Sequence, residues 1–590
     1  MRRISTRMCL VPALISAVIA SAPGPAAAGG SEFPASGTRN LGRGGSGLTR
    51  ADDPTVMLRN PALLADLWED MAYSGVHVLV PDSCFQATGN YTWTSQVDDA
   101  ANFGDGPVLV NIANASLPDG TPLPNIRDEA FPRVCYDGPV PILPNIALTM
   151  KLAPNIGVGL GFFPPDNAAL AQWGNRNGTV DTANGLRPSP TRWFRSHLNT
   201  SYFSALGAIG YRPTSWLRIG FGFQWALVVY SATEFTRPAQ TRTTSNDVRV
   251  DITGRDLFIP GLIGSVHATP IDNLDIAIGF KWSDRVKSQA KLDITTSYFG
   301  SGRAFRYVNE DGMEEVAPGL LPLRSDNRLG TVDSPPVWVP ELSFGVRYAD
   351  RLAPRATTDN ETWQASHRAA GRNVDDAMAT ERWDIELNAV VVFNGFNNYS
   401  RFVSANEMVG SQSATEDGSP GLPLTAFVGQ CTEPEATCAA REVPRPIHGK
   451  TQLSLRLGGE YNLMPGLFAV RGGLSYETDG QDPGYLNVTN YQLGRTGLHV
   501  GVTFRFAGKT DFSIAYAHFF QRSVALTVNP ARPFSTRDPG AYHVVEGEGD
   551  GVAQFPIADS SDSTEGPLFA NAGTFYYHLD VVSVALAQHF

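Results

Sequence analysis

Hydrophobic and polar residues alternate without a break along residues 217–227, LRIGFGFQWAL. Side chains of a strand point alternately to opposite sides, so the two faces of this stretch would differ sharply. One face carries Leu217, Ile219, Phe221, Phe223, Trp225 and Leu227, and the other carries Arg218, Gly220, Gly222, Gln224 and Ala226. Half-buried strands of soluble proteins alternate over about 4–8 residues. The longer run indicates an environment that covers a long apolar face.

The same division into a bulky apolar face and a face of small or charged residues recurs along the chain. It is clearest at 156–162, 274–282, 342–348, 453–461, 468–476, 498–506 and 512–518. Bulky side chains would fill the interior of a soluble barrel, so their regular segregation favours a barrel whose outside meets lipid. Strands with this alternation are typical of transmembrane β-barrels, which hold water and packed polar groups inside. Only helices and closed barrels satisfy every backbone polar group in lipid.

Weaker alternating segments lie near 72–80, 146–152, 201–210, 257–267 and 383–393. Together with the clear segments they predict an all-β fold, an antiparallel transmembrane β-barrel of about 14 strands. A secreted β-sandwich or β-propeller is the alternative to this fold.

The connections between strands differ in length. Polar segments rich in Asn, Asp, Gly, Pro and Ser occupy roughly 84–140, 163–195, 231–255, 288–335, 349–380, 404–448, 477–492 and 521–572, whereas 211–216, 267–273 and 461–466 are short. Long outer loops and short periplasmic turns give this asymmetry in outer-membrane barrels.

The two ends of the chain support export to the cell envelope. Residues 1–28 combine three arginines, an apolar run and the triplet AAA, which predicts a secretory signal peptide. The last strand would end at Phe590, which resembles the C-terminal signal of outer-membrane barrels, although Gln588 departs from that pattern. We therefore expect the protein in the outer membrane of a Gram-negative cell.

Composition and motifs limit the kinds of partner and cofactor that the protein can bind. Charged residues make up 18% of the chain and the formal net charge is −12, which argues against a nucleic-acid partner. The motif GRGGSG is not followed by Lys-Ser/Thr, so it is not a phosphate-binding loop. We expect no cofactor and no metal. Four cysteines, Cys84, Cys135, Cys431 and Cys438, follow the signal peptide, and export permits disulfides among them in any of three pairings.

Residues 40–67, NLGRGGSGLTRADDPTVMLRNPALLADL, show no alternation. Gly42, Gly44, Gly45 and Gly47 permit tight backbone paths, and Pro61 suits the first turn of a helix capped by Asn60 and continued by Ala62. Such a segment can fold back into the lumen of the barrel as a plug. A disordered periplasmic tail is the alternative.

The order of motifs resembles that of the long-chain fatty acid outer-membrane transporter family (FadL-type). The N-terminal motif LGRGGSGLTRADD…RNPALL is similar to the hatch of that family. Further similar stretches are GLGFFPPD at 159–166, YRPTSWLRIGFGFQWAL at 211–227, FIPGLIGSVHATPIDNLDIAIGFKWSDRVK at 258–287, VPELSFGVRY at 339–348 and LRLGGEYNLMPGLFAVRGGLSYETDG at 455–480. The similarity touches most strands, while the long loops are peculiar to this chain.

The resemblance implies a fourteen-stranded barrel closed by an N-terminal plug. It implies three parts: a signal peptide at 1–28, a hatch at 29–70 and the barrel at 71–590. It also implies passive, hatch-gated uptake of hydrophobic compounds such as long-chain fatty acids or aromatic hydrocarbons by a monomer in contact with outer-membrane lipid. In the family the plug changes conformation on ligand binding, and ligand leaves through a side opening in the wall.

Arginines on the inward face are candidates for binding a ligand carboxylate, because a guanidinium pairs with a carboxylate bidentately. They are Arg218, Arg347, Arg456, Arg471 and Arg505. The favoured interpretation is structural, with these arginines paired to inward acids, namely Asp275, Asp384, Glu386 and Glu460.

Three other functions compete with transport of hydrophobic compounds. A lipid-hydrolysing barrel needs a nucleophile paired with a histidine, and no nucleophile pairs by pattern with His518 or His578, so we expect no enzyme. A general porin for small polar solutes predicts an open lumen. A loop-mediated adhesion or structural role predicts no effect on uptake.

Overall fold

The computed structural model describes residues 37–67, 69–90, 111–116, 129–164, 171–192, 194–236, 248–296, 305–308, 314–317, 328–336, 338–353, 376–396, 399–404, 442–482, 486, 488, 491–521, 523–526 and 573–590. The predicted signal peptide, Cys431 and Cys438 lie outside these residues. Within them, no helix is long and apolar enough to cross a membrane.

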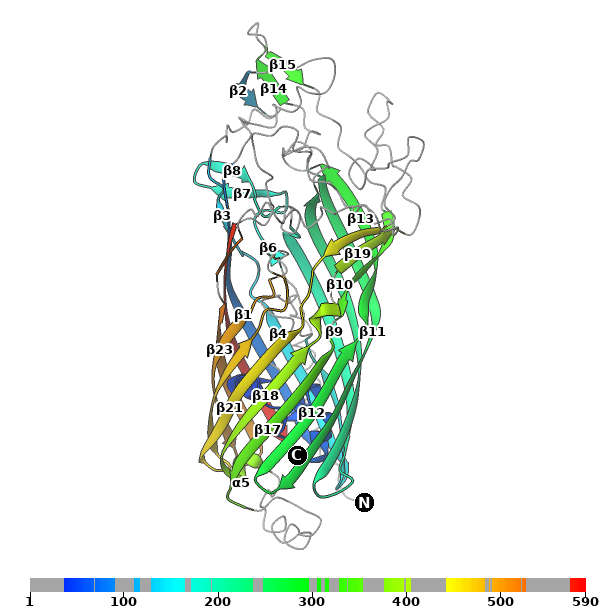
Figure 1. Ribbon diagram of the computed structural model, residues 1–590, viewed down its shortest axis with the longest axis vertical. Helices are drawn as coiled ribbons and strands as arrows, with labels where there is room; N and C mark the ends of the chain where they lie inside the picture. The colour runs from blue at the N-terminus through cyan, green and yellow to red at the C-terminus, as the bar shows by residue number, and fades with distance from the viewer. Residues whose placement is uncertain are drawn as a thin grey trace.

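Fourteen antiparallel strands close a barrel (Figure 1). In order around the wall they are β1 Met71–Ala87, β4 Ile142–Ala153, β5 Ile156–Phe162, β9 His197–Tyr211, β10 Leu217–Thr236, β11 Val248–Ile271, β12 Leu274–Ser283, β17 Glu341–Arg351, β18 Glu381–Val392, β21 Gln452–Met464, β22 Phe468–Glu477, β23 Arg495–Phe506, β24 Thr510–Gln521 and β26 Gly573–His589. Pairing of β26 with β1, from Met71 opposite His589 to Ala87 opposite Gly573, closes the ring.

Shorter strands extend the wall on its upper side. β3 Arg133–Cys135, β6 Ala171–Gln172, β13 Arg285–Thr296, β16 Arg328–Pro336, β19 Tyr399–Ser404, β20 Glu442–Pro446 and β25 Val524–Leu526 belong to the same sheet. β7 Thr179–Thr182 and β8 Gly185–Pro188 form a hairpin, and β2 Asn111–Ser116, β14 Phe305–Val308 and β15 Glu314–Ala317 form a small separate sheet. A disulfide joins Cys84 of β1 to Cys135 of β3.

The alternation in the sequence matches the two faces of the wall. Along β10, Ile219, Phe221, Phe223 and Trp225 are exposed, whereas Arg218, Gly220, Gly222, Gln224 and Ala226 are buried. On the outer surface, Phe162, Phe203 and Trp225 make successive ring contacts with centroids 5.1 and 6.2 Å apart. Tyr348 and Trp383 meet nearer the short turns. An apolar band between aromatic girdles is the outer surface of a membrane-spanning barrel.

Two expectations about the connections need correction. The segments 231–255 and 288–335 are partly strand, because β10, β11, β13 and β16 continue past the apolar band. Residues 349–353 and 376–380, the described ends of the connection 349–380, lie at the end of the barrel that carries the short turns, where α5 Ala377–Thr380 precedes β18 (Figure 1). Length alone therefore does not assign a connection to one side. Asp376 accepts a hydrogen bond from the Met378 amide, which starts α5 there.

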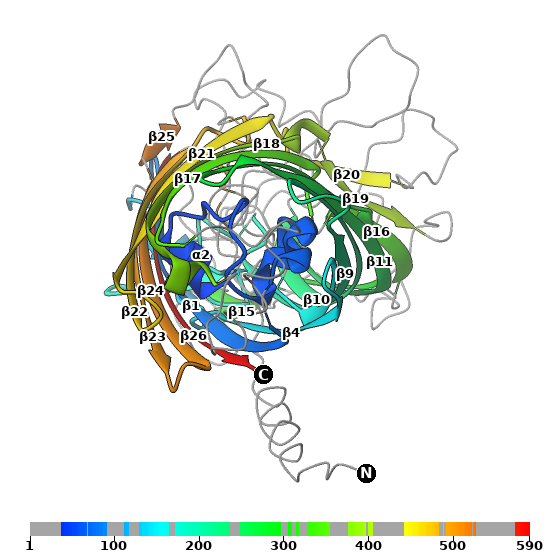
Figure 2. The same ribbon diagram turned by 90° about the horizontal axis from the view of Figure 1, so that it is seen from below.

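Residues 37–67, which we call the inner segment, lie inside the ring of strands, as the view along the barrel shows (Figure 2). They form α2 Thr38–Gly42 and two 3₁₀ helices, η1 Pro54–Leu58 and η2 Pro61–Ala65. Another 3₁₀ turn, η5 Asn394–Phe396, follows β18. Most residues of the inner segment are buried.

The outward position of Phe221 in the middle of the apolar part of β10 allows a direct test of the lipid-facing surface. Phe221→Arg should lower the free energy of unfolding in lipid vesicles by about 2–4 kcal/mol, because a charge at mid-bilayer depth is desolvated. Trp216→Arg, at the end of the barrel with short turns, should cost about 0–1 kcal/mol. Urea unfolding of both variants in vesicles measures the difference, and equal costs would contradict the proposed depth.

Candidate functional site: the inner segment within the barrel

The inner segment is organised by its own polar side chains. Asp53 caps η1, since its carboxylate accepts a hydrogen bond from the Thr55 amide at 2.9 Å. Asn60 precedes η2 as expected and Pro61 opens it, but the Asn60 side chain does not cap this helix. It instead donates to the Leu48 carbonyl at 2.6 Å and so ties the two arms of the segment together. The expected cap of η2 by Asn60 is therefore wrong. The side-chain cap in this segment is that of η1, supplied by Asp53.

The four glycines predicted to give tight backbone paths differ in their surroundings. Gly44 and Gly45 have φ values of +73° and +79°, a conformation that other residues rarely adopt. Gly42 and Gly47 are instead sites of close approach. A Cβ at Gly42 would lie 3.0 Å from the Gly501 Cα, and one at Gly47 would lie 2.6 Å from the Asn40 Oδ1.

One side of the inner segment rests directly on the backbone of the wall. Small residues form a single row across five neighbouring strands, in direct register from one strand to the next; this glycine row is Gly157, Gly210, Gly220, Ser265 and Gly279. A Cβ at Gly210 would lie 2.5 Å from the Pro61 carbonyl oxygen, and one at Gly279 would lie 2.9 Å from the Arg59 carbonyl oxygen. The Ser265 hydroxyl accepts a hydrogen bond from the Ala62 amide at 3.0 Å. The Asn60-Pro61-Ala62 motif therefore lies against the row.

The opposite side of the inner segment is held by ion pairs. Arg43 pairs with Asp384 at 2.6 Å and with Glu386 at 3.3 Å. Glu386 also accepts hydrogen bonds from the amides of Leu48 and Thr49, at 2.8 and 3.0 Å. These contacts fix residues 43–49 to β18.

Two further arginines of the inner segment reach other strands. Arg50 pairs with Asp384 and with Glu460 of β21, and Arg39 pairs with Asp511 of β24. His499 of β23 adds a hydrogen bond between its Nδ1 and the Leu41 carbonyl oxygen at 2.9 Å. The acids Asp384, Glu386 and Glu460 were expected to pair with arginines of the wall. The sequence did not reveal that they also bind Arg43 and Arg50, although the motif LGRGGSGLTRADD contains both arginines.

The inner segment lies outside the membrane-spanning strands. The pKa values of two of its carboxyl groups are shifted in opposite directions from the usual value. Burial raises the pKa of Asp53 above its usual range. Burial acts the same way on Asp52, but Arg50 and Arg39 outweigh it and hold its pKa at about 2. The stabilisation that Asp52 supplies is therefore present above its unfolded pKa and is lost only as the pH falls toward 2.

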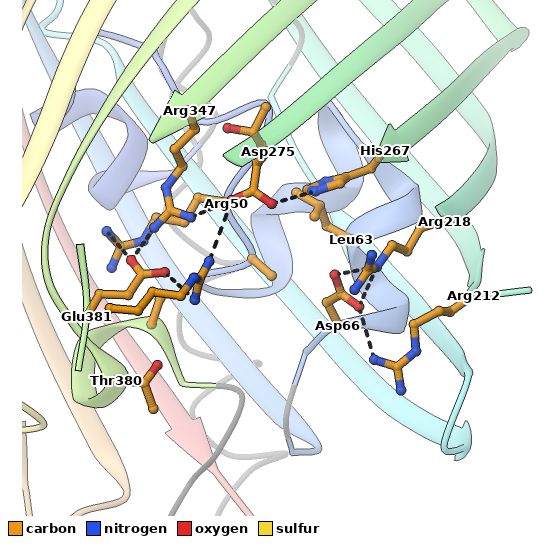
Figure 3. A pocket seen from close by; sticks show the side chains of 14 residues that line it. Arg50, Leu63, Asp66, Arg212, Arg218, His267, Asp275, Arg347, Thr380 and Glu381 are labelled. Carbon is orange, nitrogen blue, oxygen red and sulfur yellow. Dashed lines mark hydrogen bonds and ion pairs between the residues drawn. The ribbon is translucent and has the colours of Figure 1, made fainter. Parts of the chain in front are cut away.

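Arginines proposed as ligand partners are bound to acids of the barrel and the inner segment, as Figure 3 shows for Arg218 and Arg347. Arg218 pairs with Asp66 at 2.9 Å, and Arg347 with Asp275 at 2.9 Å. Arg471 pairs with Glu460, and Arg505 with Asp511 at 2.6 Å and with Asp376. Arg456 is fully buried. Asp66, Asp376 and Asp511 were not foreseen as partners, because their positions on the inner segment, before α5 and at a strand end are set by the tertiary fold.

Buried aromatic side chains cluster near the upper ends of the strands, beside the buried ion pair of Arg495 and Glu477, where only water and packed polar groups were expected. The aromatic residues Phe85, Phe194, Tyr491, Phe519, Phe575 and Tyr577 are buried there. The Phe85 ring lies 4.6 Å from that of Phe575 and 5.8 Å from that of Phe194, and Tyr491 contacts Phe575 and Tyr577. In the sequence, bulky residues occupy both faces of these upper strand ends, as in FYYHL at 575–579, so alternation gives no signal.

Among the described residues, the ladder between β4 and β5 is shorter than the ladder between β1 and β4. The ladder between β4 and β5 begins at Ile146 opposite Phe162, whereas the ladder between β1 and β4 continues to Ile142. Within the described residues, the part of β4 from Ile142 to Asn145 therefore pairs with β1 alone. Phe163, which directly follows β5, is 4% exposed, and its amide still donates to the Ser204 carbonyl of β9 at 3.0 Å. Met57 and Leu64 of the inner segment lie over Gly159 of β5.

The fold is that of a known solved structure. No protein-family model and no curated protein sequence matches the chain. A FadL homologue of Pseudomonas aeruginosa is 14% identical, with a TM-score of 0.57, over 96% of this chain and 100% of its own. The toluene transporters TodX of P. putida and TbuX of Ralstonia pickettii are 10% and 11% identical, with TM-scores of 0.48 and 0.47, each over 95% of this chain and 99% of their own. The first similarity establishes a FadL-type fold, and the protein is an outer-membrane β-barrel.

The glycine row makes a prediction about the position of the inner segment. Gly210→Val should displace residues 61–65, because its Cβ would lie within 2.9 Å of three backbone atoms of that stretch. Displacement should expose Arg59, which lies just before this stretch, to trypsin, and mass spectrometry of the digested protein should detect cleavage after it. Gly264→Val is the matched control, since no atom lies within 4 Å of a Cβ at Gly264. Equal resistance of the two variants to trypsin would refute the close contact.

The ion pairs make a separate prediction. Asp384→Asn removes the charge that Arg43, Arg50 and Arg347 share, and breaking a buried ion pair costs about 3–5 kcal/mol. We expect the inner segment to loosen while the barrel stays closed, and ion conductance through single proteins in planar bilayers to rise. Asp350→Asn, in an exposed pair with Arg382, should leave the conductance unchanged. An Asp384→Asn variant with unchanged conductance would show that these ion pairs do not hold the inner segment in place.

Proposed function

We propose that the protein takes up hydrophobic small molecules, such as long-chain fatty acids or aromatic hydrocarbons, across the outer membrane. The observation that carries the proposal is the buried apolar cluster of Phe85, Phe194, Phe519 and Phe575, which also includes Met57 and Leu64 of the inner segment. Burial of a solute there is favourable by roughly 25 cal/mol per Å² of apolar surface. Passage down a gradient then needs no energy source.

We infer that the inner segment acts as the hatch of this pathway. It fills the lower lumen between the glycine row and the acids of β18, so that the apolar region does not continue straight through the barrel. A general porin for polar solutes needs an open lumen, and the buried inner segment argues against that alternative. The FadL-type fold supports the same interpretation.

We further propose that solute leaves sideways through the wall near β4 and β5. The ladder between these strands stops at Ile146, opposite Phe162, and the next residue, Phe163, belongs to the buried apolar cluster. Lateral exit keeps a hydrophobic solute away from the charged lower lumen, where burial of apolar groups would leave ion pairs without their partners. Ligand carboxylates would have to compete with the acids that already bind Arg218, Arg347, Arg471 and Arg505, so a hydrocarbon fits the lumen as well as a fatty acid.

We propose that the barrel works as a monomer, because its wall closes within one chain. We also propose that it has no enzymatic activity. A loop-mediated adhesion or structural role would leave uptake unchanged by any change in the lumen.

Uptake by cells tests the proposal. Cells carrying the protein should accumulate labelled oleate or toluene faster than cells without it. Deletion of residues 37–67 should change the rate and admit small polar solutes as well, because it removes the proposed hatch. Phe575→Asp, which puts a charge into the apolar lumen, should slow uptake at least tenfold, whereas an aspartate at the exposed Phe520 should not. If no version alters the uptake of either solute, the transport proposal fails.

A further inference from the structure

A cavity of about 500 Å³, including its open mouth, lies at the lower end of the lumen between the inner segment, the turn after β9 and α5 (Figure 3). Its position at the end of the barrel with short turns places it on the periplasmic side. The apolar lumen lies on the other side of the inner segment. This cavity therefore is separate from the proposed transport pathway, and its lining differs in chemistry.

The lining carries more positive than negative charge. Five arginines and three carboxylates face the cavity. On one side, Arg347 pairs with Asp275 at 2.9 Å and Arg351 pairs with Glu381 at 2.9 Å, so these charges balance. On the other side, two arginines share the single carboxylate of Asp66.

The two arginines beside Asp66 are held in place by other contacts. Arg218 lies 2.9 Å from Asp66 and donates to the Thr269 hydroxyl at 2.7 Å. Arg212 lies 3.5 Å from Asp66 and donates to the Pro154 carbonyl at 3.0 Å. Figure 3 shows both side chains directed at the one carboxylate. Arg50, the fifth arginine of the lining, pairs with Asp384 and Glu460, which lie outside the lining. The uncompensated positive charge of the cavity is therefore located at Arg212 and Arg218.

Three buried polar atoms on lining residues point independently to a hydrogen-bonding ligand. Among the described residues, the Thr49 Oγ1, the His267 Nδ1 and the Arg347 Nε have no hydrogen-bond partner, and these side chains are at most 2% exposed. Buried polar groups are paired in the great majority of cases, because an unpaired one carries a desolvation cost. The His267 Nε2 is already held by Asp275 at 3.1 Å, which leaves Nδ1 as the free nitrogen of the ring.

We propose that this cavity binds a carboxylate that enters from the periplasmic end and competes with Asp66 for Arg212 and Arg218. Guanidinium groups bind carboxylates through paired, charge-assisted hydrogen bonds. Asp66 itself shows that a carboxylate fits between the two arginines.

Occupation of the site bears on the inner segment, because Asp66 directly follows η2. The Asp66 amide donates to the Leu63 carbonyl at 2.9 Å, so the carboxylate that binds Arg218 belongs to the end of that helix. A carboxylate that takes its place removes this connection between η2 and β10. Binding at the cavity therefore loosens the end of the inner segment.

Isothermal titration calorimetry of the full-length protein in non-ionic detergent tests the inference, with acetate and decanoate as the two probes. Arg212→Gln should weaken carboxylate binding about tenfold, because one of the two guanidinium partners is lost. Asp66→Asn should tighten it about tenfold, because the internal competitor loses its charge. Arg382→Gln is the control, an arginine of the same end whose exposed side chain pairs with Asp350.

The two variants should change the affinity for carboxylate in opposite directions. This separates an effect on binding from damage to the fold, since misfolding would weaken binding in both. Retained resistance to SDS at room temperature shows for each variant that the barrel is closed. Acetate binding with these signs assigns the site to a free small carboxylate, whereas the same signs with decanoate alone assign it to the head group of a longer acid.

Absence of binding of both probes, weakening by Asp66→Asn, or equal weakening by Arg382→Gln would overturn the inference. A protein that still takes up toluene but binds neither probe would lose this site and keep the proposed function.

Discussion

The arrangement of the lumen depends on the direct contact between two backbones. Across β5, β9, β10 and β12 the wall presents glycine where it meets residues 59–64, so that no side chain separates the inner segment from the sheet. A second pair, Gly458 opposite Gly473, accommodates the backbone of Arg43 on the far side. Any Cβ at these positions would push the segment toward the centre of the barrel. The ion pairs of Arg43 and Arg50, whose geometry requires the segment to lie close to β18, would then be broken.

This close contact also explains why buried charge is tolerated in the lower lumen. Removing charges from water costs several kcal/mol per ion, and only good geometry with further hydrogen bonds offsets that cost. Asp384 meets three arginines, and Glu386 accepts two backbone amides besides Arg43. The network is thus satisfied only when the inner segment is in place. Its contribution is to fix one position and register of the segment, which a purely apolar contact would not do.

The wall was predictable from the sequence and much of the lumen was not. Period-two alternation identified strands such as β10, β12, β17, β23 and β24. Lipid on the outside favours bulky apolar side chains, whereas the crowded inside favours small or polar ones, so the two faces differ. The signal fails where the strands leave the membrane. There, Phe575 and Tyr577 face inward while Tyr576 faces outward, and both faces are bulky. The acidic partners of Arg218 and Arg505 could not be predicted either, because tertiary folding brings Asp66, Asp376 and Asp511 to them. The glycines of the row were visible as small inward residues, but only the register shows that they are aligned.

The two halves of the inner segment respond differently to a hydrophobic solute, if the proposed pathway is right. Residues 39–50 are held by ion pairs, and an apolar molecule offers nothing that competes with a carboxylate for a guanidinium. Residues 54–65 are held by apolar packing, with Met57 and Leu64 over Gly159 of β5 and Leu63 in the same apolar cluster as Phe163 and Leu206. A solute in the lumen replaces such contacts at little cost, since one apolar surface substitutes for another. Displacement would therefore begin at η1 and η2, beside the strand with the short ladder to β4, while residues 39–50 stay attached to β18, β23 and β24. The same chemistry that admits the solute thus selects which half of the segment moves, and the attached half returns it when the solute has left.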